Sequence, residues 1–169
     1  MTTKLKLNRE FAIRHIGVAL LMFGLSCYFG YDGFVGYPST PAADLYRSIE
    51  GSDAPAGFDL AAFKRQKIQS QYGFMALTLL AALIIGGHVW AISRLRFSFD
   101  DEGFTCGKRR FAYSDITSVD RSKWATKTII KVNGITLDAW HHEGVKAFVE
   151  RLERLRPPEA ETKPKEGDA

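Results

Sequence analysis

The chain has 169 residues, of which 46% are hydrophobic and 25% are charged, and its net charge is +4. This size allows one globular domain with extra segments or two small modules. The counts of 15 glycines, 6 prolines and 2 cysteines exclude a collagen, a low-complexity disordered chain and a disulfide-stabilised scaffold.

The first apolar run follows a basic segment at the amino terminus. Residues 1–14 carry four basic side chains and one acidic side chain, whereas residues 16–31 carry no charge. A helix needs about 20 apolar residues to cross the hydrocarbon core of a bilayer. We therefore expect a cytoplasmic basic tail at 1–14 and a first transmembrane helix at 15–36, with Asp32 at the headgroup level. A cleaved signal peptide also has a basic start and an apolar middle, so this alternative stays open.

The second apolar run is richer in Leu, Ile and Ala and extends over residues 72–92. Trp90 precedes Arg94 and Arg96, and an aromatic residue followed by cations is typical of the end of a span. The pattern predicts a second transmembrane helix at 72–93. Basic residues near both ends of the pair favour a topology with both termini cytoplasmic, although a basic cluster at 64–67 argues for the opposite orientation.

The residues between the two runs, 37–71, are expected to form an extracytoplasmic connecting segment with a helical part. Residues 42–50 are expected to form one short helix before Gly51. Asp59 is a typical N-cap residue, and no Gly or Pro interrupts residues 60–72. The second long helix is therefore expected to begin near residue 60, outside the bilayer.

Small residues recur in both apolar runs. Gly30, Gly33 and Gly36 lie three residues apart, and Gly86 and Gly87 lie near the end of the second run. Small residues let membrane helices approach each other closely. They predict either contact between the two helices or a homo-oligomer through Gly30, Gly33 and Gly36.

After residue 94 the apolar and polar residues alternate, which is typical of strands. Gly107-Lys108 and Asn133-Gly134 each separate two strand-like segments and predict hairpins. Residues 145–155 have apolar positions at helical spacing. We therefore predict a small α+β domain at 94–156, with five or six antiparallel strands covered by one amphipathic helix, and a disordered tail at 157–169.

This order of strands and helix resembles the pleckstrin-homology-like (PH-like) domains that are attached to membrane spans in bacteria. The resemblance covers residues 95–156 and lies in LRFSFDDEGFTCGKRRFAYSDITSVDRSKW, TIIKVNGITLDAW and HEGVKAFVERLERL. It implies a short antiparallel PH-like sheet, in a fold that usually has seven strands, capped by one carboxyl-terminal helix. Together with the two apolar runs, it implies a membrane α-helical hairpin that carries this domain in the bacterial inner membrane, a multi-pass cell-membrane protein.

The most basic surface feature of the predicted domain is the hairpin tip formed by Lys108, Arg109 and Arg110. Basic residues close to a membrane gain about 1 kcal/mol each from anionic lipid. The tip is either a contact for anionic lipid or a solvated turn. The other basic residues are spread along the domain, a pattern that does not favour nucleic acid as a partner.

We expect no catalytic residue, no cofactor and no metal. The sequence has no phosphate-binding loop, dinucleotide-binding turn or nucleophile elbow. The cluster His141-His142-Glu143 lacks the spacing and the partners of a zinc site and is expected to begin a helix. The three acids at 100–102 are expected to be solvated turn charges.

These patterns together favour a non-enzymatic, membrane-anchored interaction module. Its partners are the lipid bilayer and, at the cytoplasmic membrane surface, a protein or anionic lipid bound by the PH-like domain. The alternative is an accessory subunit of a membrane enzyme or transport complex.

Overall fold

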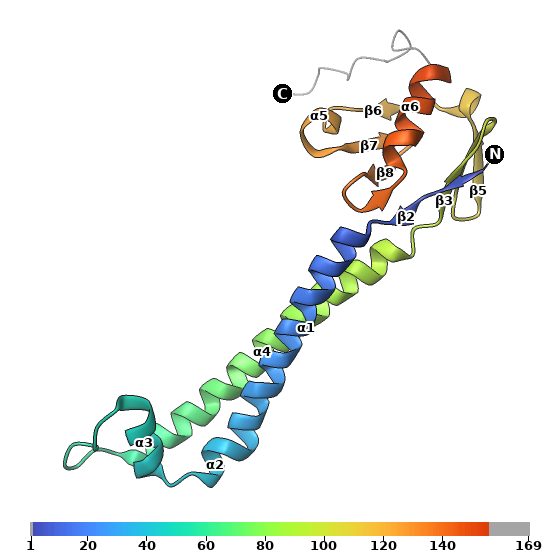
Figure 1. Ribbon diagram of the computed structural model, residues 1–169. Helices are drawn as coiled ribbons and strands as arrows, with labels where there is room; N and C mark the ends of the chain where they lie inside the picture. Colours follow the sequence, from blue (N-terminus) through green and yellow to red (C-terminus); the bar gives the residue numbers. More distant parts are fainter. Residues whose placement is uncertain (1, 156–169) are drawn as a thin grey trace. The chain divides into compact units, whose positions relative to one another are not determined.

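A computed structural model describes residues 2–155 of the chain, which divide into two compact units. The sheet unit contains residues 2–13 and 90–155, and the helical unit contains residues 14–89. Figure 1 shows the elements of both units along the chain. The tail predicted at 157–169 lies outside the described residues.

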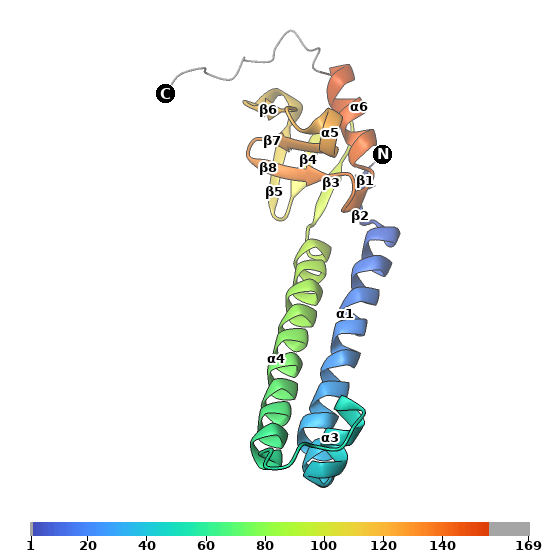
Figure 2. The same ribbon diagram turned by 90° about the vertical axis from the view of Figure 1, so that its left-hand side faces the viewer.

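Two long helices form most of the helical unit. α1 (Arg9–Tyr31) continues into the π-helical turn η1 (Asp32–Gly36) and the short α2 (Tyr37–Ser39). α3 (Ala42–Glu50) follows, and α4 (Leu60–Ser93) returns beside α1 (Figures 1 and 2).

The two helix boundaries predicted in the connecting segment are confirmed. Oδ1 of Asp59 accepts hydrogen bonds from the N–H groups of Ala61 (3.1 Å) and Ala62 (2.9 Å). These bonds satisfy two of the donors that a helix leaves free in its first turn. Gly51, with a φ of 75°, ends α3 in the left-handed conformation that glycine adopts without strain.

Both long helices are long and apolar enough to cross a membrane. The two stretches, Arg9–Ser39 and Leu60–Ser93, contain the expected spans 15–36 and 72–93, and only 11% of the most apolar window of each is buried. A surface helix of a soluble protein buries an apolar stripe against its own core. These helices instead leave most of their apolar side chains exposed.

Two glycines, Gly30 of α1 and Gly33 of η1, let this continuous helical segment approach α4. A Cβ atom on Gly33 would lie 2.8 Å from the Tyr72 ring, and one on Gly30 would lie 3.2 Å from Sδ of Met75. The Tyr72 hydroxyl donates a hydrogen bond to the carbonyl oxygen of Gly33 (3.0 Å). The contact between the two helices that the small residues predicted is therefore present at Gly30 and Gly33, whereas Gly36 lies against side chains of its own helical segment.

The sheet unit contains three antiparallel sheets within the described residues, with the strand orders β1-β3-β4-β5, β2-β9 and β6-β7-β8. The strands are β1 (Thr3–Lys4), β2 (Lys6–Leu7), β3 (Phe97–Phe99), β4 (Gly103–Cys106), β5 (Arg109–Ala112), β6 (Val119–Asp120), β7 (Ile129–Val132), β8 (Ile135–Asp138) and β9 (His142–Glu143). The helices are η2 (Tyr113–Asp115), α5 (Trp124–Lys127) and α6 (Val145–Leu155).

The amino-terminal segment belongs to the sheet unit. β1 pairs with β3, and β2 pairs with β9. Between them Leu5 is buried in the core, and its N–H donates to the carbonyl oxygen of Phe97 (3.0 Å). We had expected a tail at 1–14 and a domain confined to 94–156. Strands of two residues are too short to show an alternation in the sequence, so their pairing was not foreseen.

The two predicted hairpins are confirmed. Asn133 and Gly134 have φ values of 48° and 78° and connect β7 to β8. Gly107, with a φ of 62°, and Lys108 connect β4 to β5. Two-residue hairpin turns need positive φ, which Asn and Gly adopt at the lowest cost.

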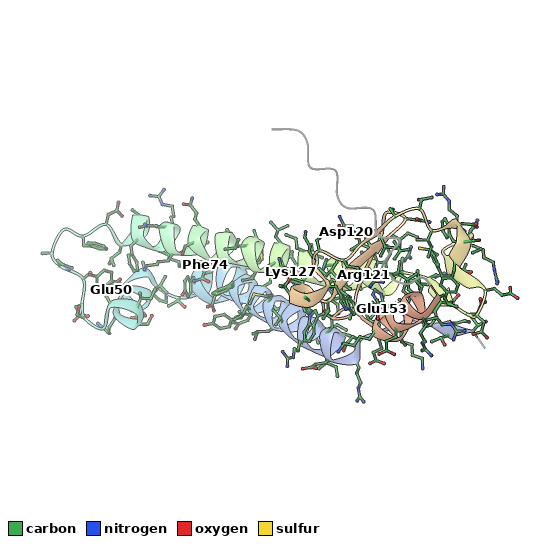
Figure 3. All side chains as sticks on the ribbon, turned by 90° about the horizontal axis from the view of Figure 1, so that it is seen from above. Glu50, Phe74, Asp120, Arg121, Lys127 and Glu153 are labelled. Atoms are coloured by element: carbon green, nitrogen blue, oxygen red, sulfur yellow. The ribbon has the colours of Figure 1, made fainter. Side chains whose placement is uncertain are left out.

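α6 covers the sheets with its apolar face. The Phe148 ring centroid lies 5.0, 5.4 and 5.6 Å from those of Phe97, Phe99 and Phe104. An ion pair of 3.1 Å between Arg121, which follows β6, and Glu153 of α6 holds the outer face of the helix (Figure 3). The predicted combination of antiparallel strands and a covering helix is therefore confirmed. The buried core consists of Leu5, Phe97, Phe99, Phe104, Ile116, Ile130, Val132, Leu137, Val145, Phe148, Val149 and Leu152.

Candidate functional site

The predicted basic tip is the turn between β4 and β5. Lys108 lies in the turn, and Arg109 is the first residue of β5, opposite Cys106. Both side chains are exposed, and no carboxylate among residues 2–155 forms an ion pair with either of them. These two cations are therefore available to an anionic surface.

Arg110 has a different environment from its two neighbours. Its Nη2 lies 2.9 Å from Oε2 of Glu102 and 3.4 Å from Oδ2 of Asp100. We had expected Arg110 to act together with Lys108 and Arg109, and the acids at 100–102 to be solvated turn charges. The structure instead joins Arg110 to two of those acids, so the uncompensated charge of the tip is carried by Lys108 and Arg109.

Asp100 is held in its ionised form. The backbone N–H groups of Glu102 and Gly103 donate hydrogen bonds to its Oδ1 (3.0 and 3.1 Å). These bonds, first the one from Glu102, and the nearby Arg110 guanidinium lower the pKa of the Asp100 carboxyl. Asp100 therefore keeps its negative charge at neutral pH and continues to compensate Arg110.

The β4–β5 turn lies beside the segment that leaves α4. The N–H of Gly107 donates to the carbonyl oxygen of Arg96 (2.8 Å), a residue three positions after the end of α4. At that end the Arg94 guanidinium lies 3.9 Å from the Trp90 ring centroid, in cation–π contact. We call the four exposed cations gathered on this part of the sheet unit the basic edge: Arg94, Arg96, Lys108 and Arg109.

A groove of about 440 Å³ on the four-stranded sheet shares Arg96 with the basic edge. Lys4 of β1, Ser98 of β3 and Thr105 of β4 also line it. Leu5 provides part of its apolar lining. The groove combines two cationic side chains with two hydroxyl groups, which suits an anionic ligand. Sequence reasoning missed it, because its residues come from three strands that only tertiary pairing brings together.

A second pocket of about 440 Å³ lies between the end of α4 and strands β7, β8 and β9. Nε2 of His142 lies 3.3 Å from the carbonyl oxygen of Ile92, so this nitrogen donates, and Nδ1 has no partner within the described residues. Burial lowers the pKa of His142. Nδ1 of the adjacent His141 lies 3.5 Å from Oδ2 of Asp138. We had expected these histidines to begin a helix, but His142 belongs to β9, which pairs with β2.

Metal-ligating residue types do not cluster in the part of the chain that the structure describes. No group of three or more His, Cys, Asp and Glu side chains among residues 2–155 is placed to hold a metal ion. Cys27 and Cys106 are free thiols, and burial raises the pKa of the Cys106 thiol, which lowers its reactivity. The chemistry that the basic edge and the groove offer is the binding of negatively charged groups.

Comparisons with known proteins identify no relative. No family model, no curated protein and no solved structure matches the chain. The function is therefore inferred from the geometry of the two units themselves.

Proposed function

We propose that this protein is a non-enzymatic, membrane-anchored interaction module. Two transmembrane helices hold a PH-like domain at the cytoplasmic surface of the bacterial inner membrane, where the basic edge contacts anionic lipid. The observation that carries this proposal is the hydrogen bond from Gly107 to Arg96, because it fixes the basic turn beside the residues that leave α4.

The exposed apolar surface of α1 and α4 supports membrane insertion. A bilayer supplies the apolar surroundings that the chain itself does not provide for these helices. At the end of α4, Trp90 is exposed and in contact with Arg94. An aromatic ring next to a cation is the combination found where spans meet the membrane–water interface.

The pairing of the amino terminus with the sheet unit supports an even number of crossings. β1 and β2 pair with strands that follow α4, and Leu5 belongs to the same core as Phe148. A chain that crossed the membrane only once between residues 13 and 90 would separate these partners. Removal of the first run as a signal peptide would also remove β1 and β2, so the pairing favours its retention.

Two of the three basic residues at 64–67, Lys64 and Lys67, have local partners. Nζ of Lys64 donates to the carbonyl oxygens of Pro38 (2.9 Å) and Thr40 (2.7 Å), and Nζ of Lys67 lies 3.9 Å from Oε1 of Glu50. Lys64 and Lys67 therefore hold parts of the connecting segment together. This structural role makes them a weaker argument for placing the segment in the cytoplasm. The basic edge at the other end of α4 favours a cytoplasmic sheet unit by the positive-inside rule.

The strand count supports the PH-like interpretation once β1 is included. The sheets β1-β3-β4-β5 and β6-β7-β8 contribute seven strands within the described residues, and α6 follows them. Seven strands and one closing helix are what the resemblance implies. Residues 94–155 hold seven strands, β3 to β9, where five or six were predicted, and the amino terminus adds β1 and β2; β2 and β9 pair as a separate short sheet.

The contact between the two long helices argues against a second copy of this chain as the partner. Gly30 and Gly33 already face α4, so a homo-oligomer through Gly30, Gly33 and Gly36 would use a face that the helical hairpin occupies. A protein that co-purifies in fixed ratio after mild detergent extraction would instead identify the chain as an accessory subunit.

Replacing two cations of the basic edge tests the proposal. Each cation close to an anionic membrane contributes about 1 kcal/mol, so Lys108→Gln/Arg109→Gln should lose about 2 kcal/mol of lipid preference. The measurement is the enrichment of phosphatidylglycerol over phosphatidylcholine around the full chain in mixed nanodiscs. Lys123→Gln/Lys127→Gln removes the same charge outside the basic edge and is the matched control. An equal loss in both variants, or no enrichment for the wild type at low salt, would contradict the proposal.

Accessibility of introduced cysteines tests the topology separately. In a chain without Cys27 and Cys106, an impermeant thiol reagent added to intact cells should modify the Ser52→Cys variant and leave the Thr2→Cys variant unmodified. The reverse pattern would place the sheet unit on the outer surface.

A further inference from the structure

Four polar side chains converge on the groove of the four-stranded sheet. Lys4 pairs with Ser98 between β1 and β3, and Ser98 pairs with Thr105 between β3 and β4. Paired residues on neighbouring antiparallel strands have Cβ atoms about 5 Å apart on the same face. Arg96 precedes Ser98 by two residues, which is about 7 Å along an extended chain. All four line the groove of about 440 Å³.

These four side chains are available to a ligand. Among residues 2–155, no carboxylate forms an ion pair with Lys4 or Arg96, and the hydroxyls of Ser98 and Thr105 form no hydrogen bond. Arg110 lies opposite Thr105 and forms ion pairs with Asp100 and Glu102. The groove therefore presents positive charge and hydroxyl donors without a competing anion.

We propose that this groove binds a phosphate monoester. The inference deepens the proposed function, on which its membrane source rests, by naming the chemical group that the sheet unit recognises. The binding is stoichiometric and depends on hydroxyl groups, whereas the contact of the basic edge with lipid depends on charge alone.

A phosphate monoester matches the donors of the groove in charge and number. It carries close to two negative charges at neutral pH and three strongly accepting terminal oxygens. The Lys4 ammonium and the Arg96 guanidinium supply charge-assisted hydrogen bonds, and the hydroxyls of Ser98 and Thr105 supply two more donors. A carboxylate, with one charge and two oxygens, would leave part of this set unused. The partly exposed Leu95, which also lines the groove, offers apolar surface to the organic part of the ester.

Two sources offer this group. Arg96 follows the end of α4 by three residues, so the groove opens near the point where the proposed span ends. Phosphatidic acid presents a phosphate monoester at that level of the membrane. Glycerol 3-phosphate presents the same group in solution without the acyl chains.

The experiment uses the full chain in nanodiscs and has one arm for each source. The first arm titrates glycerol 3-phosphate into protein in phosphatidylcholine discs and measures the heat of binding. The second arm adds phosphatidic acid to the discs and follows its phosphorus resonance. In both arms the wild type is expected to show saturable binding.

Two variants and one control separate a built site from diffuse attraction. Ser98→Ala/Thr105→Val removes both hydroxyls without changing the net charge and is expected to weaken binding at least about tenfold, since hydrogen bonds to a charged group are among the stronger ones. Lys4→Gln/Arg96→Gln is expected to weaken it at least about a hundredfold. Lys108→Gln/Arg109→Gln is the control and should change binding of glycerol 3-phosphate less than about threefold, because neither side chain lines the groove and exposed charges are weakened by salt.

The two arms and the variants distinguish results that support the inference from results that overturn it. Saturable binding that both groove variants lose and the control retains supports the inference. Binding in both arms shows that the phosphate group itself is recognised, whereas binding in only one arm assigns the site to that source. Absence of saturable binding in both arms overturns it, as does binding that the hydroxyl variant leaves unchanged. Failure of the proposed function is recognised separately, because the glycerol 3-phosphate arm does not depend on the lipid preference of Lys108 and Arg109.

Discussion

Apolar side chains have opposite environments in the two units of this protein. In the sheet unit, Ile130, Leu137 and Phe148 are 0% exposed, whereas Leu77 and Leu83 in the helical unit are both 64% exposed. Full burial of such a side chain contributes about 1.5–3 kcal/mol. The sheet unit obtains this stabilisation from its own core, whereas the helical unit does not bury these side chains within the chain. The same residue types therefore form a core in one unit and an exposed apolar surface in the other, and in the proposed function that surface contacts lipid.

The comparison predicts the largest effect for a charge placed in the core of the sheet unit. Phe148→Asp would bury a carboxylate without a partner among aromatic rings, which costs several kcal/mol, and we expect the sheet unit to unfold. The measurement is thermal unfolding followed by tryptophan fluorescence. Leu155→Asp, on the same helix but 49% exposed, is the control and should melt like the wild type. An unchanged cooperative melt for Phe148→Asp would show that α6 does not cover the sheets.

A charge at an exposed leucine of the helical unit should weaken membrane insertion and leave the stability of the sheet unit unchanged. Leu83→Asp costs about 3 kcal/mol for insertion if residue 83 lies near the centre of a span, but it exposes no new surface in water. We expect a smaller fraction of the chain to resist carbonate extraction from membranes, with no change in the melt of the sheet unit. Leu83→Ile is the control. Full retention of the aspartate variant in the membrane would argue against a lipid-facing position for Leu83.

The next largest expected effect is a loss of stability of the sheet unit when its amino-terminal segment is altered. Leu5→Ala removes a buried side chain and should destabilise the sheet unit by about 2–3 kcal/mol, measured by denaturant unfolding. Lys6→Ala, at the exposed neighbouring position, should change stability little. A fragment that begins at residue 94 lacks β1, β2 and Leu5, and we expect it to fold only when a peptide of residues 2–8 is added. Independent folding of that fragment would show that the amino-terminal strands are dispensable.

Local signals in the sequence predicted the elements whose cause is local. Asp59 caps α4 through N–H groups two and three residues away, and Asn133-Gly134 sets the β7–β8 turn through its own φ values. The strands β1 and β2 had no such signal, because each has only two residues and its partner lies far along the chain, where Lys4 pairs with Ser98 and Leu7 pairs with His142. Their assignment needed the tertiary pairing.

The candidate site, too, was predictable only where its signal is local in the sequence. Lys108 and Arg109 stand out as a basic turn in the sequence, and the structure leaves both exposed. The pairing of Arg110 with Asp100 depends on the register between β4 and β5 and was missed. Alternation in the sequence places Ser98 on the face opposite Phe97 and Phe99, but nothing in it brings Lys4 to the same face.

The smallest expected effect is a pH response of the sheet unit that originates at His142. Its imidazole is 6% exposed, and burial lowers its pKa below the ordinary histidine value of 6.5. The carbonyl oxygen of Ile92 and the carboxylate of Asp138 oppose this change, and His141 adds to it, but burial is the largest influence. The folded imidazole therefore stays neutral at pH values at which the unfolded one has already bound a proton.

The sign of the effect follows from this difference in proton binding. Between the folded pKa and 6.5 the unfolded chain binds more protons, so the stability of the sheet unit falls as the pH drops through that interval. Above it His142 is neutral in both states and contributes no slope. We expect the unfolding temperature of the full chain to fall as the pH drops below the ordinary histidine value of 6.5, and to fall less steeply for His142→Gln. Parallel curves for the two proteins would assign the pH response to other groups, with the His141–Asp138 pair as the nearest, and would leave His142 as a neutral part of the core at every pH tested.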